Sequence, residues 1–134
     1  MIVVDTSAWV EFLRGTGSPV DQLLATAVQT GERLGVLDVV RLELLAGAGS
    51  EGRVLDLRRL LARFTPLSGA SAADHEQAAA LYRAARRSGE TVRSLVDCLV
   101  AAAALRLEVP VLARDRDFVV LARVSELELV PAPG

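Results

Sequence analysis

The sequence predicts an α/β fold in which a short, five-stranded parallel sheet lies between two layers of helices. Short apolar runs rich in Val, Leu and Ile alternate with longer segments whose apolar residues recur every three to four positions. This alternation favours a parallel sheet covered on both faces, because parallel strands are joined by helical crossovers. The length of 134 residues fits one domain with one core. We therefore expect a single domain over residues 1–134, with a frayed tail at 131–134.

The N-terminal quarter predicts a strand followed by two helices. Residues 2–4 form a β-branched run, and the apolar residues after it fall at helical spacing up to Gly15. Ser18 and Pro19 then supply an N-cap and a first helical residue, and Gly31 is a suitable end for the second helix.

The next segment predicts another strand, two helices and a short extended piece. Residues 34–37 are short and apolar, as in a buried strand, and Asp38 is placed to cap a helix that ends before Gly47. The segment 53–64 repeats Leu or Val at helical spacing with arginines between them, which predicts an amphipathic helix. Residues 65–67 follow as an extended piece.

Two Ser-x-x-Asp patterns mark the helices of the second half. Ser71 and Asp74 resemble a capping box at the start of a long, Ala-rich helix that ends near Gly89. Ser94 opens a helix over 95–107, whose run of four alanines implies close approach to neighbouring backbone. We expect this to be the central buried helix.

The C-terminal segment predicts the last two strands. Residues 110–113 form one strand, 118–122 a short helix and 127–130 the final strand. These strands bring the expected total to five.

Composition and charge exclude several classes of protein. The 15 basic residues, all Arg, against 17 acidic residues give a net charge of −2, without the basic excess of a protein that coats nucleic acid by charge alone. The single cysteine, Cys98, rules out an internal disulfide. No apolar run reaches the roughly 18 to 20 residues of a spanning helix, and the first residues carry an acid where a signal peptide carries basic residues. We expect a cytoplasmic protein with no membrane segment.

Acidic residues gather at one predicted edge of the sheet. Asp5 directly follows the first strand and Asp115 lies just beyond the fourth, so both carboxylates emerge at the same edge if these strands are neighbours. Asp97 is the third residue of its helix if Ser94 is the cap. Glu43 lies in the helix after the second strand, and its leucine neighbours place it at the rim of a buried face.

Each of these acids also has a purely structural interpretation. Asp5 could cap the helix that follows it, and Ser94 with Asp97 matches a capping box. Glu43 could be an exposed helix residue, which is the commonest fate of a glutamate. The sequence leaves these alternatives open.

The turn after the fourth strand carries two aspartates. Asp115 and Asp117 lie on either side of Arg116, in a position where Asp is also favoured for local hydrogen bonds. Both the structural and the functional interpretation apply here too.

Several carboxylates in one pocket require a cation, because their mutual repulsion would otherwise raise their pKa values. Oxygen ligands alone indicate Mg²⁺ or Mn²⁺, whereas zinc would be expected to use Cys or His, and the chain has only Cys98 and His75, far apart in sequence. Such a site suits phosphodiester hydrolysis, in which the metal orients water and offsets charge on the phosphate.

These residues resemble those of the PIN-domain ribonucleases, and within them the VapC toxins of bacterial toxin–antitoxin pairs. The resemblance spans essentially the whole chain and rests on the pieces MIVVDTSAWVEFLRG, VVRLELLAG, GETVRSLVDCLVAAAALR and VPVLARDRDFVVLARV. It implies a PIN-like fold and an Mg²⁺-dependent endoribonuclease, with Mn²⁺ as a substitute, that cleaves tRNA, rRNA or mRNA as the toxin of a type II pair. The catalytic and metal-binding acids of the family motif fall on Asp5, Glu43, Asp97 and Asp115, with Asp117 as an outer ligand.

The resemblance also implies supporting residues and partners. Thr6 or Ser7 matches the hydroxyl that steadies the first carboxylate, whereas Ala113 stands where the family often has Thr or Ser. The implied partners are an RNA substrate, a second copy of the chain in a homodimer, and a VapB-type antitoxin whose tail occupies the acidic groove. Arg93 is the candidate for a contact with an RNA phosphate or with the antitoxin.

Two non-enzymatic interpretations compete with the nuclease. A receiver-like α/β module also gathers acids at strand ends, but such modules need a Lys near the acidic pocket and this chain has none. A PIN fold that only binds a protein partner is the other alternative, and the complete set of acids argues against it.

Overall fold

The computed structural model describes residues 1–69 and 71–131, and its centre is a four-stranded parallel sheet. The strands lie in the order β3-β2-β1-β4. Their bounds are Ile2–Val4 for β1, Leu34–Leu37 for β2, Thr65–Leu67 for β3 and Val111–Leu112 for β4. All pairings are parallel, so the carboxyl ends of the four strands face the same edge.

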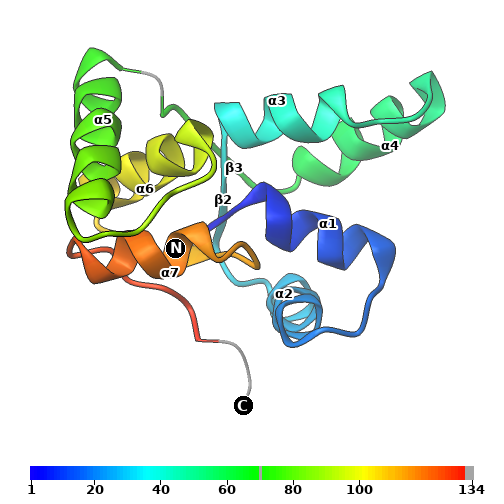
Figure 1. Ribbon diagram of the computed structural model, residues 1–134. Coiled ribbons are helices and arrows are strands. Elements are labelled where there is room, and N and C mark those ends of the chain that lie inside the picture. Colours follow the sequence, from blue (N-terminus) through cyan, green and yellow to red (C-terminus); the bar gives the residue numbers. More distant parts are fainter. Residues whose placement is uncertain (70, 132–134) are drawn as a thin grey trace.

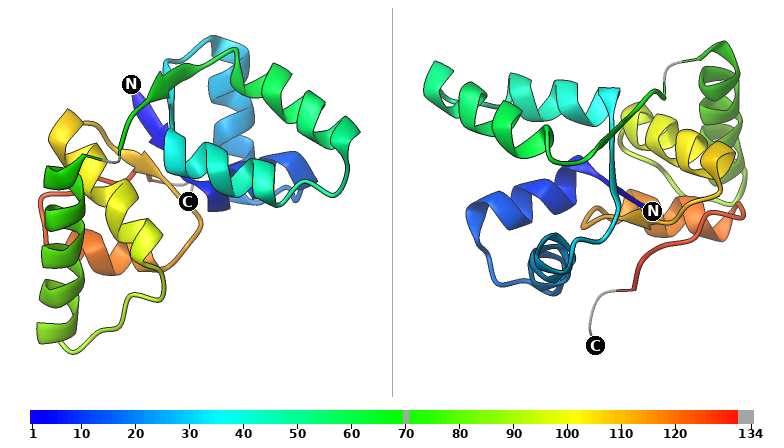
Figure 2. Two further views of the ribbon diagram at one scale, coloured as in Figure 1. Left: turned by 90° about the horizontal axis from the view of Figure 1, so that it is seen from above. Right: turned by 180° about the vertical axis from the view of Figure 1, so that it is seen from behind.

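Seven helices in the described parts of the chain form two groups, one on each side of the strands (Figures 1 and 2). The first group is α1 (Thr6–Arg14), α2 (Pro19–Thr30), α3 (Asp38–Ala46) and α4 (Glu51–Leu61). The second group is α5 (Ala72–Arg87), α6 (Leu95–Leu107) and α7 (Asp117–Arg123). The expected three-layer α/β/α fold is therefore confirmed.

The expected fifth strand is wrong. Residues 127–130 form a single parallel bridge, in which Leu129 pairs with Val111 and the Val130 N–H donates to the Val111 carbonyl at 2.9 Å. Two causes limit this pairing: β4 has only two residues, and Pro131 has no N–H to continue a ladder. The expected frayed tail at 131–134 falls mostly on residues 132–134, which lie outside the described residues.

The remaining boundaries shift by a few residues. The helix expected over 53–64 begins at Glu51, because the Ser50 hydroxyl caps it by accepting from the Arg53 N–H at 3.2 Å. Asp38 is the first residue of α3 and not its cap. No helix in residues 1–69 and 71–131 is long and apolar enough to cross a membrane.

Helix α6 is the central buried helix, as its composition predicts. Four consecutive alanines, 101–104, are at most 1% exposed, and the helix packs against α5 and, to a lesser extent, α7 and α3. Close packing on both sides fixes the position of α6, and its first turn carries Asp97 to the carboxyl edge of the sheet.

Candidate metal centre

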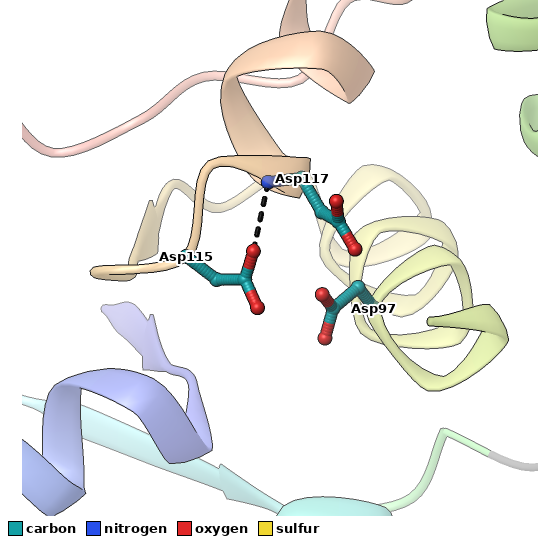
Figure 3. A group of neighbouring side chains, drawn as sticks. All are labelled: Asp97, Asp115 and Asp117. Carbon is teal, nitrogen blue, oxygen red and sulfur yellow. Dashed lines mark hydrogen bonds between the residues drawn. The ribbon is translucent and has the colours of Figure 1, made fainter. Parts of the chain in front are cut away.

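Three aspartates meet at the carboxyl edge of the sheet. Asp97, Asp115 and Asp117 each offer a carboxylate oxygen, and these oxygens lie within 4.8 Å of one another. Asp97 comes from the first turn of α6, Asp115 from the turn after β4 and Asp117 from the start of α7 (Figure 3). Their carboxylates point toward one another, although the residues are up to 20 positions apart in the chain.

Asp5 adjoins this cluster and is 2% exposed. It follows β1 directly and caps α1, because its Oδ2 accepts from the Ser7 N–H at 3.0 Å. The capping interpretation is therefore true, but it occupies only one oxygen. Within the described chain, buried Oδ1 has no hydrogen-bond partner and is left free for another ligand.

The Ser7 hydroxyl joins the first acid to the turn that carries Asp115. It donates to Asp5 Oδ2 at 2.6 Å and accepts from the backbone N–H groups of Arg114 at 2.9 Å and Asp115 at 3.2 Å. Ala113 cannot supply such a bond, and Ser7 reaches the same turn from α1. The hydroxyl thus fixes both acids relative to each other.

Glu43 lies at the rim of the site and outside the three-aspartate cluster. The Thr6 hydroxyl donates to its Oε1 at 2.7 Å, which ties α3 to the start of α1. Glu43 is half-buried, so it is not the exposed helix residue of the structural alternative. Its charge reaches Asp5, whose pKa it helps to raise.

The start of α6 is capped from another element. Asp117 is 3% exposed, and its Oδ2 accepts from the backbone N–H groups of Arg93 at 2.9 Å and Ser94 at 3.1 Å. The Ser94 side chain makes no capping hydrogen bond. The capping box that was the structural alternative for Ser94 and Asp97 is therefore not formed.

Burial and like charges disfavour the ionised acids. Burial raises the pKa of Asp5, with Glu43 adding to the effect, while the hydrogen bonds from Ser7 oppose it. The pKa of Asp97 is raised to about 9, and burial is the largest cause. The charge of Asp5, a hydrogen bond with Asp117 and the charge of Asp115 are smaller causes in the same direction. A cluster with these pKa shifts is stabilised by a cation.

The residues present fit a hard divalent cation. Two buried carboxylate oxygens, Asp5 Oδ1 and Asp97 Oδ2, have no hydrogen-bond partner within residues 1–69 and 71–131. An all-oxygen donor set is the kind that Mg²⁺ and Mn²⁺ prefer. Cys98 adjoins Asp97, but burial raises the pKa of its thiol to about 11, which keeps the sulfur protonated and a poor metal ligand.

Two arginines border the site. Arg93 is exposed, and its backbone N–H is bound to Asp117. Arg114 Nε pairs with Glu11 Oε1 at 3.2 Å, which links the turn after β4 to α1. No local sequence pattern predicts this pair, because 103 residues separate its members.

A groove of about 610 Å³ opens beside Glu43, between α1, α3 and α4. Apolar residues such as Val10, Leu13 and Leu57 line it together with charged residues, and Thr6 and Glu43 also belong to its lining. A segment bound in this groove would therefore contact Thr6 and Glu43, at the rim of the acidic site.

Comparisons with known proteins agree with this geometry. The sequence model of the PIN domain family matches residues 2–124. The chain is 42% identical over 132 residues to the VapC ribonuclease Mb1587 of Mycobacterium bovis and to ribonuclease VapC11 of Mycobacterium tuberculosis, covering 96% of each chain in both comparisons. Its fold is similar to that of VapBC2 from Rickettsia felis bound to a promoter DNA fragment, with a TM-score of 0.75, 18% identity and coverage of 97% and 98%. The chain belongs to the PIN domain family and, within it, to the VapC ribonucleases.

Proposed function

We propose that this protein is a divalent-metal-dependent endoribonuclease that acts as the toxin of a type II toxin–antitoxin pair. The observation that carries the proposal is the cluster of Asp97, Asp115 and Asp117 beside the two unpartnered oxygens of Asp5 and Asp97. The 42% identity to two VapC ribonucleases supports RNA as the substrate.

Asp5, Glu43, Asp97 and Asp115 would hold Mg²⁺, or Mn²⁺ in its place, with Asp117 in an outer position. The bound ion would orient water and the scissile phosphate and offset the negative charge that develops on the phosphate oxygens. Ser7 keeps Asp5 and the Asp115 turn in register, and Thr6 fixes Glu43. Neither the protonated thiol of Cys98 nor any Ser–His pair in the described chain supplies a nucleophile, which favours water over a protein side chain as the attacking group.

The test is cleavage of a single-stranded RNA by the purified protein. EDTA should abolish cleavage, Mg²⁺ or Mn²⁺ should restore it, and the products should carry 5′-phosphate and 3′-hydroxyl ends. Asp5→Asn should be inactive, whereas Glu76→Gln, which removes an exposed acid of α5, serves as the matched control. Products with 2′,3′-cyclic phosphate ends would contradict water as the nucleophile, because they require attack by the RNA 2′-hydroxyl.

We propose a VapB-type antitoxin as the inhibitory partner, bound in the groove between α1, α3 and α4. The groove is lined by apolar residues and by Thr6 and Glu43, so its occupant would cover the Glu43 side of the acidic site. Leu13→Glu should weaken a complex with a VapB-type antitoxin. Leu55→Glu, a similarly exposed leucine of α4 outside the groove, should leave the complex intact. Equal binding by both variants would exclude this groove.

We further propose that the protein is a cytoplasmic homodimer, as the resemblance to VapC toxins implies. Light scattering of the purified chain should give twice its 14.2 kDa mass. A monomer that still cleaves RNA would show that pairing is not needed for activity.

The second candidate is a PIN fold that only binds a protein partner. The unpartnered carboxylate oxygens favour the nuclease, since a binding module has no need to bury unpaired acid. An RNA-inactive wild type that binds neither Mg²⁺ nor Mn²⁺ would favour this alternative.

A further inference from the structure

Asp97 occupies the position in α6 from which a carboxylate normally closes a capping box. It is the third residue of the helix, and Ser94 is the N-cap. In a capping box, the side chain at this position reaches back to the N–H of the cap residue. In α6 the Ser94 N–H donates instead to Asp117 Oδ2 at 3.1 Å, and the Arg93 N–H donates to the same oxygen at 2.9 Å.

Helix α5 shows what the same pattern does when no other acid intervenes. Its N-cap is Ser71, whose hydroxyl accepts from the Asp74 N–H at 3.1 Å. The Asp74 carboxylate accepts from Arg106 Nε at 2.8 Å and Nη2 at 3.2 Å, and this pairing, ahead of the contacts with Ser71, lowers its pKa. In α5 the third-position carboxylate is therefore held by Arg106, and its contacts with Ser71 keep it beside its own helix start.

We infer that Asp117 is a positioning residue that occupies the helix start of α6 and so keeps the Asp97 carboxylate turned toward Asp5 and Asp115. This inference rests on the proposed metal-dependent function and assigns to Asp117 a role other than direct metal binding. Its carboxylate is nearly fully buried and holds two N–H groups with one oxygen. A carboxylate is also the favoured group at a helix N-terminus, where the backbone dipoles leave positive charge.

Without Asp117, the donors of Arg93 and Ser94 would lack an acceptor, which is costly for backbone groups of limited solvent access. Asp97 is the acid placed to replace it. Rotation of Asp97 into the capping box would stabilise the helix start and remove one oxygen donor from the metal centre. Loss of Asp117 should therefore weaken metal binding more than it weakens folding.

The test compares Asp117→Ala with Asp117→Asn by calorimetric titration with Mn²⁺ and by thermal unfolding without metal. Asn retains a carbonyl oxygen that can accept from both N–H groups, so D117N should bind Mn²⁺ within about 3-fold of wild type. D117A should bind about 10- to 100-fold more weakly, as expected when a residue that orients a ligand is removed. Asp21→Ala removes another helix-start carboxylate, which accepts from the Gly17 N–H at 2.9 Å, and should leave Mn²⁺ affinity unchanged.

The double variant D97A/D117A provides a second readout that needs no metal. If Asp97 replaces Asp117 at the helix start, the double variant should unfold at a lower temperature than the sum of the single effects predicts. Equal, ten-fold or greater losses of Mn²⁺ affinity in D117N and D117A would overturn the inference and make Asp117 a direct ligand. If D117A does not fold, the Mn²⁺ affinity of D117N alone tests the inference: a change within about 3-fold supports it, and a ten-fold or greater loss overturns it. A wild type that binds Mn²⁺ but cleaves no RNA would refute the proposed function and leave this assignment standing.

Discussion

Two helices of this protein begin with the same Ser-x-x-Asp pattern and put the aspartate to opposite uses. Asp74, at the start of α5, and Asp97, at the start of α6, are 2% and 6% exposed. Asp74 meets Arg106, with Nε to Oδ1 at 2.8 Å, and this bond does most to lower its pKa. Asp97 meets Asp5, Asp115 and Asp117, and its pKa rises to about 9.

The difference shows that the surroundings of a buried acid, and not the local sequence, decide its role. A buried carboxylate beside an arginine is neutralised within the protein and joins two helices. A buried carboxylate among other carboxylates remains uncompensated until a cation arrives. The first arrangement predicts a contribution to stability, and the second predicts a contribution to catalysis at a cost in stability.

The largest expected effect is the loss of activity when Asp97 is neutralised. Asp97→Asn should lower RNA cleavage by more than about 100-fold, because it removes a metal-binding carboxylate. The same variant should melt at a higher temperature than wild type in the absence of metal, because Asp97 must take up a proton to be buried among the other acids and Asn needs none. Cleavage assays and calorimetry on the same preparation measure both, and undiminished cleavage would contradict the site.

The second prediction is the opposite for Asp74: its removal should lower stability and leave activity unchanged. Asp74→Ala breaks the pair with Arg106, which also donates to the Ser68 carbonyl at 2.7 Å, and should lower the free energy of unfolding by about 1 to 3 kcal/mol. The loss stays moderate because the Arg106 side chain is 44% exposed and can return to water. Cleavage per folded molecule should not change.

The matched control is the more exposed pair of Arg123 and Glu90, whose side chains are 61% and 31% exposed. Glu90→Ala should cost less than about 1 kcal/mol in a urea titration. A similar cost for both pairs would mean that burial of Asp74 adds nothing to its bond with Arg106.

The sequence predicts the order of the elements and the edge at which the acids gather, because both follow from local pattern. Strand ends place Asp5 and Asp115, and helical spacing places Asp97 in the first turn of α6. The sequence could not show that Asp117 caps α6, since its bonds to Arg93 and Ser94 span 24 and 23 residues. Whether a capping box forms at Ser94 and Asp97 depends on such distant contacts.

The same reason explains what the sequence missed elsewhere. Arg106 lies 32 residues from Asp74, and nothing in either segment distinguishes that pair from a solvated one. The failed fifth strand has a different cause, because an apolar run such as 127–130 predicts a strand whether or not its neighbour is long enough to pair with it.

The third prediction concerns pH, where the two aspartates should act in opposite directions. The raised pKa of Asp97 means that the folded protein keeps a proton which the unfolded chain releases near pH 4, so this group lowers stability as pH rises from about 4 to about 9. The lowered pKa of Asp74 means that its contribution is present above pH 4 and is lost as pH falls through the lowered value.

Thermal unfolding of the metal-free protein from pH 3 to pH 9 measures both slopes. D97N should reduce the decline between pH 4 and pH 9, and Asp74→Asn should reduce the decline on the acid side. Saturating Mn²⁺ should flatten the first slope in wild type, because the cation offsets the charge that Asp97 gains. A wild-type protein whose stability rises steadily up to pH 9 would contradict the raised pKa.

The smallest expected effect belongs to Arg93, which connects the acidic edge to the substrate. Its backbone N–H is held by Asp117, and its exposed side chain therefore extends from a fixed point beside the metal centre. A net charge of −2 provides no broad basic surface, so a few placed arginines must meet the RNA phosphates. Arg93→Ala should weaken cleavage and lower the slope of log affinity against log salt by about one phosphate contact, without moving the cleavage position.

Arg87→Ala, at the exposed end of α5, is the control and should keep the wild-type slope. If Arg93→Ala also keeps that slope and the wild-type rate, Arg93 faces the antitoxin or solvent, and the phosphate contact must be sought at Arg14, Arg114 and Arg116.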